Sequence, residues 1–272
     1  MTRYAVMGDP IAQSKSPQIH SQFANLTKQN VAYEKLRVEA HEFPARVNAF
    51  FNGGGGGLNV TVPHKEDAFA LADTASPRAA LAKAANTLGM DVAGKLWADN
   101  TDGIGLVRDL ENNNHCTIKD KNILILGAGG AARGAMAELI HRQPASLTIM
   151  NRTTSRADAL RDDFTGEFPI GVRELNQPNT VLFDLVINAT SMGLQNQTLE
   201  LSSELFAAKF TAYDMMYGAT DTAFMLWAKS IKADLVLDGL GMLVEQAAES
   251  FALWRGVRPH TKDVILKLRN EL

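Results

Sequence analysis

Residues 124–132 read Leu-Ile-Leu-Gly-Ala-Gly-Gly-Ala-Ala, and this stretch decides the fold of the second half of the chain. An apolar run enters the glycines directly, and an alanine-rich helical pattern follows them. In a dinucleotide-binding turn, one glycine allows the tight turn, the next lets the backbone approach a pyrophosphate, and a third small residue packs helix on strand. Gly127, Gly129 and Ala132 stand at these places, and the helix start offers free N–H groups to the anion. The stretch predicts nucleotide binding; the alternative is a purely structural glycine turn.

The segment after the next apolar run indicates which nucleotide is bound. Residues 146–150 are followed by Asn151-Arg152-Thr153-Thr154-Ser155-Arg156. NAD-binding folds usually carry an acidic residue here, roughly 20 residues past the glycines, for the ribose 2′-hydroxyl. A carboxylate would repel a 2′-phosphate, whereas an arginine fork binds one bidentately. Arg152 and Arg156, with Asn151 and Thr153, therefore favour NADP. The alternative is that both arginines belong to a solvated helix start, where a spacing of four would let them face one way.

Length and composition exclude several classes of protein. The 272 residues suffice for two modest domains, and a formal net charge of −3 gives no support to nucleic-acid or anionic-membrane binding. Cys116 is the single cysteine, and the six histidines show no ligand-like arrangement, so we expect neither a disulfide nor a metal. The chain opens as a strand, with neither a signal-peptide core nor a membrane-length apolar run. We expect a soluble cytoplasmic protein, as a monomer or homodimer.

Strand-like runs alternate with helical patterns in two series, which predicts an α/β fold with two domains. The first series places strands at 4–7, 33–38 and 58–62 and helices near 17–27, 42–52 and 65–72, in a largely parallel sheet. The second places strands at 122–126, 146–150, 185–188, 212–214 and 235–238, in a Rossmann-like NADP-binding domain. We expect a substrate domain at 1–102, the nucleotide domain at 103–238, and C-terminal helices at 239–272 that pack back on the first domain.

Two smaller features carry structural expectations. The five glycines at 53–57 lack the lysine and hydroxyl residue that end a P-loop, so we expect a flexible connector before the strand at 58. Trp227, Phe251 and Trp254 have helical spacing, and we expect them in the core rather than at a dimer contact.

Polar residues follow the predicted strands of the first domain. Ser16 precedes a proline in the pattern of a helix N-cap, whereas Ser14 has no such structural duty. Asn59 and Thr61 share one face of a strand whose other face is apolar, and Lys65 comes at its end. Polar groups on a buried strand need partners, and a hydroxylated ligand would supply them.

A further polar segment combines Asn86-Thr87 with Asp99-Asn100-Thr101-Asp102-Gly103. Taken alone, Asp102-Gly103 is also an ordinary turn dipeptide. Together the segments offer hydroxyls, amides, one ammonium and one carboxylate, without metal-ligand spacing or a serine-nucleophile elbow. This set suits a small polyhydroxylated acid as the substrate.

These segments, with Asn188-Ala189-Thr190-Ser191 and Asp238-Gly239-Leu240-Gly241-Met242, closely resemble shikimate dehydrogenase over essentially the whole chain. The resemblance implies the reversible NADPH-dependent reduction of 3-dehydroshikimate to shikimate in aromatic amino-acid biosynthesis. It implies Lys65 and Asp102 as the catalytic pair, with Lys65 as general acid held near the carbonyl by Asp102.

The resemblance also implies the residues that bind the two ligands. The hydroxy acid would be surrounded by the catalytic pair and by Ser14, Ser16, Asn59, Thr61, Asn86, Thr101, Tyr217 and Gln246. The cofactor would contact Gly127, Ala128, Gly129, Gly130, Ala131, Ala132, Asn151, Arg152, Thr153, Arg156, Thr190, Ser191, Met192, Met215 and Gly239.

The chain departs from the family pattern at a few positions. Gln13 stands where a histidine is common, Ala85 where valine is usual, and Met216 where an aromatic residue is more usual. None of these removes a polar site residue, so they bear on fine specificity. Two alternatives stay open: a quinate/shikimate dehydrogenase with relaxed use of NAD and NADP, and a non-catalytic NADP(H)-binding regulatory module. The second would lack the Lys65–Asp102 pair, which is present.

Overall fold

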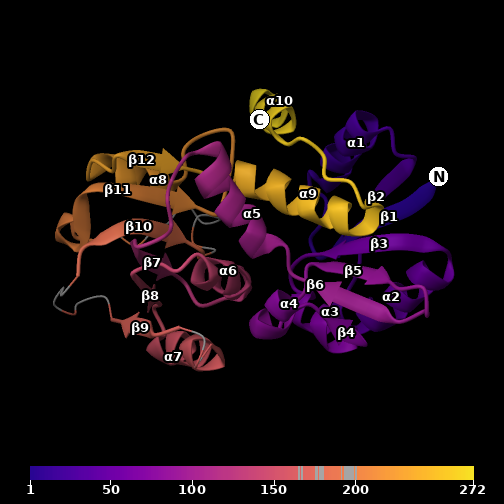
Figure 1. The fold of residues 1–272 in the computed structure, drawn as a ribbon, viewed down its shortest axis with the longest axis horizontal. Coiled ribbons are helices and arrows are strands. Elements are labelled where there is room, and N and C mark those ends of the chain that lie inside the picture. Colours follow the sequence, from indigo (N-terminus) through magenta and orange to yellow (C-terminus); the bar gives the residue numbers. More distant parts are fainter. Residues whose placement is uncertain are drawn as a thin grey trace. The chain divides into compact units, whose positions relative to one another are not determined.

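The computed structural model describes residues 1–164, 166, 168–174, 177, 181–190, 192, 199 and 201–272. It divides into two compact units, one of residues 1–105 with 243–267 and one of residues 106–242 with 268–272. Across the described part of the chain, no helix is long and apolar enough to cross a membrane. Each unit contains one sheet, shown with its helices in Figure 1.

The sheet of the second unit is parallel throughout its described pairings, in the order β12-β11-β10-β7-β8-β9. Figure 1 shows these strands one above another, with β12 at the top. The strands are β7 (Asn122–Leu126), β8 (Ser146–Met150), β9 (Ile170–Arg173), β10 (Phe183–Asn188), β11 (Phe206–Asp214) and β12 (Leu235–Leu237). From the β9 edge, the strands run backwards in chain order to β7 and then forwards from β10 to β12, which is the doubly wound order of dinucleotide-binding domains. The direction of the strand order therefore reverses between β7 and β10.

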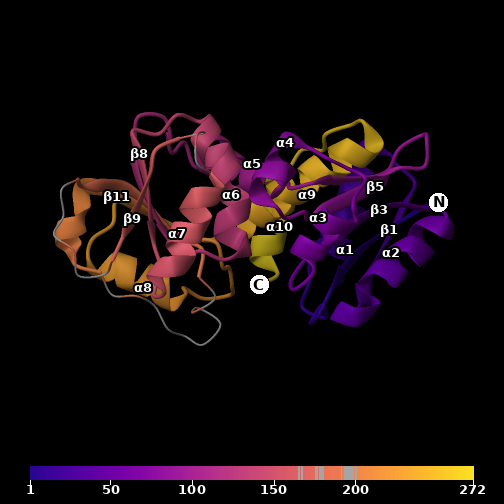
Figure 2. The same cartoon turned by 90° about the horizontal axis from the view of Figure 1, so that it is seen from below.

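Helices cover this second sheet. They are α6 (Gly130–His141), α7 (Thr154–Asp163) and α8 (Ala223–Ser230), and α5 (Asp102–Arg108) leads into the unit through a π-helical turn (Asp109–Asn113). Figure 2 shows α7 and α8 from below. Trp227 on α8 is 7% exposed and packs against Phe206 and Phe224, which confirms its place in the core.

The sheet of the first unit mixes directions, in the order β2-β1-β3-β5-β6-β4. Its strands are β1 (Thr2–Gly8), β2 (Val31–Arg37), β3 (Gly55–Val60), β4 (Thr74–Ala75), β5 (Thr87–Met90) and β6 (Leu96–Asp99). The pairs β1–β2, β1–β3 and β4–β6 are parallel, whereas β5 runs antiparallel to β3 and β6. The α/β prediction is confirmed, but the β5–β6 hairpin was not expected.

Helices lie on both faces of this first sheet (Figures 1 and 2). The helices are α1 (Ser16–Thr27), α2 (Phe43–Asn52), α3 (Lys65–Leu71), α4 (Pro77–Ala82) and α9 (Leu240–Arg255), and α10 (Lys262–Asn270) follows α9 in the chain. Alternation along β1 sends Ala5 and Met7 into a core formed with α2 and α3. On the opposite face, Tyr4 contacts Trp254 of α9, and Phe251, which is 1% exposed, packs on Phe23 of α1.

The glycine run is not a flexible connector, so that expectation is wrong. Gly55, Gly56 and Gly57 belong to β3, where side chains of other elements occupy the space of their missing Cβ atoms. A Cβ at Gly57 would lie 2.4 Å from the Trp254 ring, and one at Gly55 would lie 2.1 Å from the ring of Phe50. The pairing with β1 shifts register at this point, since Arg3 pairs with Gly55 and Tyr4 with Gly57. The glycines therefore form a bulged strand that aromatic rings approach closely.

Candidate active site

The polar segments of the first unit meet at one edge of its sheet. Strands β1, β3 and β6 end at this edge, and the antiparallel β5 begins there. The register places Asn59 opposite Thr87, and Thr87 opposite Asp99. Because each polar segment lies at one of these strand ends, residues far apart in sequence come within hydrogen-bonding distance.

Lys65 and Asp102 form an ion pair between the first residues of two helices. The ammonium Nζ of Lys65 donates to Oδ2 of Asp102, and the two side chains are only 19% and 10% exposed. Oδ1 of Asp102 accepts a hydrogen bond from Asn86 Nδ2 at 2.8 Å. The Ala85 N–H also binds the carbonyl of Lys65 at 2.8 Å. Both oxygens of the carboxylate are thus engaged, which fixes the direction in which it holds the ammonium.

Asn86 is the centre of a hydrogen-bond network. Besides Asp102, its amide nitrogen lies 2.9 Å from Thr101 Oγ1 and 3.3 Å from Gln246 Oε1. Its carbonyl oxygen accepts from the Thr101 backbone N–H at 2.9 Å and from Thr87 Oγ1 at 2.8 Å. The structure therefore brings together four of the predicted substrate residues: Asn86, Thr101, Asp102 and Gln246. Asn86 and Thr101 are at most 3% exposed, so this network is pre-formed.

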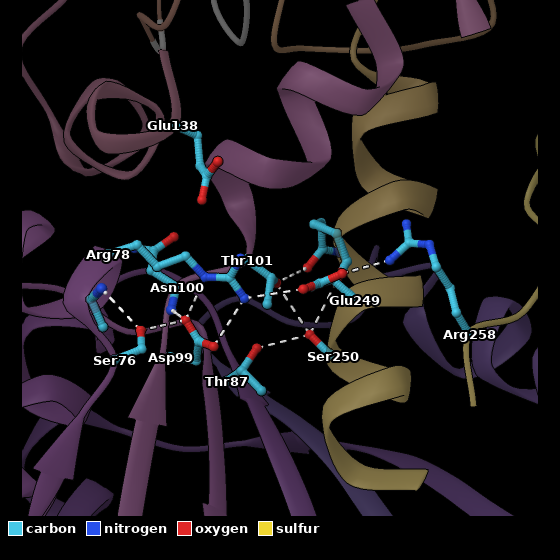
Figure 3. Close-up of polar contacts among 12 residues, drawn as sticks. Ser76, Arg78, Thr87, Asp99, Asn100, Thr101, Glu138, Glu249, Ser250 and Arg258 are labelled. Carbon is cyan, nitrogen blue, oxygen red and sulfur yellow. Dashed lines mark hydrogen bonds and ion pairs between the residues drawn. The ribbon is translucent and has the colours of Figure 1, made fainter. Parts of the chain in front are cut away.

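Asn59 is held by partners on both sides of its amide. Its Oδ1 accepts from the Tyr33 hydroxyl at 2.7 Å, and its Nδ2 donates to Asn86 O at 3.1 Å and to Ser250 Oγ at 3.0 Å. Ser250 also lies 2.8 Å from Thr87 Oγ1, and Figure 3 shows its hydroxyl beside those of Thr87 and Thr101. Sequence reasoning missed Tyr33 and Ser250. The spacing of four between Gln246 and Ser250 on an apolar helix was the signal that could have revealed Ser250.

The two serines of the first loop correct the sequence interpretation. Ser16 is the first residue of α1 rather than its N-cap, and Lys15 at the cap position makes no side-chain capping bond. Ser14 does have a structural role, because its hydroxyl accepts the Ser16 N–H at 3.3 Å and donates to the Ser16 hydroxyl at 3.1 Å. The two hydroxyls therefore lie side by side. Thr61, half-buried, follows β3 and donates its backbone N–H to Met7 O at 2.9 Å.

The glycine turn of the second unit has the predicted geometry. Gly127 has φ +103°, and a Cβ there would lie 3.1 Å from the Ala189 carbonyl oxygen, so any side chain would be strained and crowded. Gly129 precedes α6, which begins at Gly130, and a Cβ on either glycine meets no described heavy atom within 4 Å. Ala132 is fully buried between helix and strand. The turn thus combines free space at a helix N-terminus with backbone donors, which suits a pyrophosphate.

Two exposed arginines follow β8. Helix α7 begins at Thr154, so Arg156 lies in its first turn and Arg152 precedes it. The two arginines therefore do not lie on one face of a helix, although their spacing of four would have allowed this. Thr153 takes the N-cap position, and Asn151 Nδ2 donates to the Thr153 carbonyl at 2.8 Å. Neither arginine has an ion-pair partner among the residues that the structure describes. Two free guanidinium groups beside a dinucleotide turn suit the 2′-phosphate of NADP.

Other predicted cofactor residues lie at the carboxyl ends of β10 to β12. Thr190 is held by Asn188 Oδ1 through its hydroxyl at 2.7 Å. Gly239 approaches Met215 so closely that a Cβ would lie 2.2 Å from the Met215 carbonyl oxygen, so this position requires glycine. Met192 is half-buried, and Ser191 lies outside the described residues. Tyr217 belongs to the second unit, where burial and the charge of Asp238 raise the pKa of its hydroxyl.

Comparison with known proteins identifies the family. Three family descriptions match successive parts of the chain: the shikimate dehydrogenase substrate binding domain at residues 6–88, shikimate / quinate 5-dehydrogenase at 109–205, and the shikimate 5′-dehydrogenase C-terminal domain at 239–265. The chain belongs to the shikimate dehydrogenase family. A relative in that family, the NADP(+) shikimate dehydrogenase of Alkalilimnicola ehrlichii, is 49% identical over 272 residues and 99% of each chain.

Solved structures of similar proteins share the fold of this chain. The shikimate 5-dehydrogenase of Thermus thermophilus, solved in complex with NADP(H) and shikimate, has a TM-score of 0.89 at 32% identity and covers 100% of both chains. An enzyme from Pseudomonas putida has a TM-score of 0.92 at 42% identity, with 98% of each chain covered. The predicted two-domain α/β fold is that of this family.

Proposed function

We propose that this chain catalyses the reversible NADPH-dependent reduction of 3-dehydroshikimate to shikimate, a step of aromatic amino-acid biosynthesis. The observation that carries the proposal is the Lys65–Asp102 pair, in which one carboxylate oxygen holds the ammonium and the other is fixed by Asn86. A ketone reduction needs a proton donor fixed near the carbonyl oxygen, and this ammonium provides one.

The chemistry divides between cofactor and protein. When bound, the nicotinamide supplies the hydride to the ring carbonyl carbon, or takes it up in the reverse direction. Lys65 donates a proton from Nζ to the carbonyl oxygen as that oxygen gains negative charge, so that C=O becomes CH–OH. In the oxidation of shikimate, Lys65 takes the proton back from the hydroxyl. Asp102 orients the ammonium throughout and keeps it at the edge of the sheet.

The surrounding residues have matching binding roles. We assign the ring hydroxyls to Asn59, Asn86, Thr101 and Gln246, since their amides and hydroxyls are already ordered by one another. We assign the substrate carboxylate to the adjacent hydroxyls of Ser14 and Ser16, with Thr61 and Tyr217 completing the substrate set.

Different parts of the chain would bind the two ligands. Residues 103–238 would bind NADP, with the pyrophosphate at the glycine turn and the 2′-phosphate at Arg152 and Arg156, and residues 1–102 with the C-terminal helices would bind the substrate. We propose that the enzyme acts in the cytoplasm as a monomer or homodimer. Its single cysteine suits a reducing compartment, because no intramolecular disulfide can form.

The test is nicotinamide absorbance with purified protein, shikimate and NADP, run beside NAD and beside quinate. We expect rapid reduction of NADP with shikimate, and a loss of about 10²–10⁴-fold in kcat for Lys65→Ala. Lys95→Ala, an exposed lysine in the turn between β5 and β6, is the matched control and should keep full activity. Near-normal turnover by Lys65→Ala would contradict the catalytic assignment.

A second candidate differs only in substrate range. The matched family description names both shikimate and quinate, so a quinate/shikimate dehydrogenase of the same fold is the alternative. Comparable rates with quinate or with NAD would favour it. A folded protein that binds NADP but reduces it with neither substrate would instead favour a regulatory module.

A further inference from the structure

A set of ion pairs beside the proposed site has no part in the chemistry described above. Arg78 on α4 donates from Nε to Asp99 Oδ1 at 2.7 Å and from Nη2 to Asp99 Oδ2 at 2.9 Å. The same Nη2 reaches Glu249 Oε1 on α9 at 3.3 Å. Figure 3 shows the Arg78 guanidinium lying between these two carboxylates. Arg78 therefore joins the end of strand β6 to helix α9.

The Asp99 end of this connection leads to the catalytic carboxylate. Asp99 Oδ1 also accepts the Asn100 backbone N–H and the Ser76 hydroxyl, each at 2.6 Å. Asn100 Oδ1 then accepts the backbone N–H of Asp102 at 3.1 Å, while Asn100 Nδ2 donates to Ala84 O at 3.0 Å. The segment from Asp99 to Asp102 is thus held by successive side-chain bonds to its own backbone, and Arg78 fixes the first of them.

The Glu249 end leads to the helix face that contacts the substrate residues. Glu249 is one helical turn from Gln246, whose Oε1 binds Asn86 and Thr101, and precedes Ser250, whose hydroxyl binds Asn59. The second oxygen of Glu249 accepts from Arg258 Nη1 at 2.5 Å, so this carboxylate is held from both sides. Movement of α9 relative to β6 would therefore stretch the contacts of Gln246 to Asn86 and Thr101, and Asn86 also binds Asp102.

Burial distinguishes this pair from an ordinary surface ion pair. The side chains of Arg78 and Asp99 are 19% and 7% exposed, so both lose much of their hydration. A buried ion pair contributes little net stability compared with apolar packing, and its best-supported use is to specify one arrangement. The Arg78 guanidinium donates two hydrogen bonds to the Asp99 carboxylate and so fixes the orientation of that carboxylate, which the ammonium of a lysine would not do.

We infer that Arg78 is a positioning residue for the dehydrogenase reaction, which sets Asp102 and Gln246 in place relative to Lys65. This inference rests on the proposed catalytic role of Lys65 and Asp102. Arg78 touches neither of these side chains through any contact described above, and it acts through Asp99 on one side and Glu249 on the other.

The experiment is a double-mutant cycle on kcat for shikimate oxidation, with Arg78→Met and Asp102→Asn. We expect Arg78→Met alone to lower kcat by about 10-fold while the KM for NADP stays unchanged, because the cofactor-binding residues belong to the other unit. In the Asp102→Asn background, Arg78→Met should lower kcat by only about 2-fold, since Asp102 is already altered and only the effect through Gln246 remains. Arg78→Lys, which keeps the charge but loses the fork, should fall between wild type and Arg78→Met.

The control is Arg255→Met, which removes another partly buried arginine of the same unit, bonded to Gln29 and Tyr4 instead. Arg255→Met should keep the wild-type kcat even if its thermal unfolding midpoint is lower than that of the wild type. Equal fold-losses from Arg78→Met in both backgrounds, or an equal loss in Arg255→Met, would overturn the positioning role. If Arg78→Met does not fold, Arg78→Lys and Glu249→Gln replace it in the same cycle. An Asp102→Asn enzyme with wild-type kcat would instead overturn the proposed catalytic pair, and the positioning role with it.

Discussion

His20 should make the stability of this protein depend on pH. Its ring is fully buried and stacks on Tyr33, with 4.1 Å between ring centroids and 6° between ring planes. Neither ring nitrogen has a hydrogen-bond partner in the described part of the chain. Burial, partly opposed by the nearby Asn59 side chain, lowers the pKa of His20 from 6.5 to about 3. The folded protein therefore holds this imidazole neutral where an unfolded chain would protonate it.

The magnitude follows from the two pKa values. Because the unfolded state binds the proton more tightly, the free energy of unfolding is highest above pH 6.5 and falls as the pH drops towards 3. The slope within this window is about 1.4 kcal/mol per pH unit, which gives a loss of about 2 kcal/mol between pH 7 and pH 5. His20→Phe keeps an aromatic ring against Tyr33 and removes the titrating group, so it should lack this component.

Urea unfolding at pH 7, 6 and 5, followed by far-ultraviolet circular dichroism, measures the effect. The free energy of unfolding of the wild type should fall by about 2 kcal/mol more than that of His20→Phe between pH 7 and pH 5. His41→Gln is the control, because it removes an imidazole from the surface, where the His41 side chain is 78% exposed. Parallel pH dependences for wild type and His20→Phe would refute the argument, since they would show that His20 takes up no proton on unfolding.

Three further predictions concern the cofactor, the fold and the substrate. Arg152→Ala should lower kcat/KM for NADP by about 10–100-fold and leave kcat/KM for NAD unchanged, because a hydrogen bond to a charged group contributes roughly 1.5–3 kcal/mol. Steady-state rates with both cofactors measure this, and equal losses with NAD and NADP would contradict it. Gly57→Ala should lower the free energy of unfolding by about 1–3 kcal/mol, because its Cβ would lie 2.4 Å from the Trp254 ring; unchanged urea unfolding by tryptophan fluorescence would count against this contact. Ser14→Ala should raise the KM for shikimate by about 10-fold, and unchanged kinetics would remove Ser14 from the substrate site.

The sequence predicted the second unit well because most of its signals are local, although it missed the edge strand β9 at 170–173. The runs at 122–126 and 146–150 coincide with β7 and β8, since each is a buried apolar strand bounded by turn residues. The β5–β6 hairpin was missed because its strands have only four residues each and little alternation. The glycine run was misread because nothing local shows that the rings of Phe50 and Trp254 occupy its surface.

The hydrogen-bond network of the candidate site was predictable in some of its members but not in its connections. Polar residues at the ends of buried strands marked Asn59, Asn86 and Asp102, because such positions need partners. The network that joins them depends on Ser250, which lies 191 positions from its contact Asn59, and on the antiparallel register that sets Thr87 opposite Asp99. Neither distance nor register can be read from residue types alone.

The bulge at Gly56 also limits how the length of the glycine run can vary. Beyond it, Ala5 pairs with Leu58 and Val6 with Asn59, so a slip of one residue would exchange the apolar and polar faces of β3. A chain with one glycine fewer can keep these pairs by closing the bulge into a regular ladder. A chain with two fewer must also shorten the two-residue turn Gly53-Gly54 between α2 and β3, in which Gly54 has φ +79°. Deletions within this repetitive stretch should therefore be tolerated once and not twice.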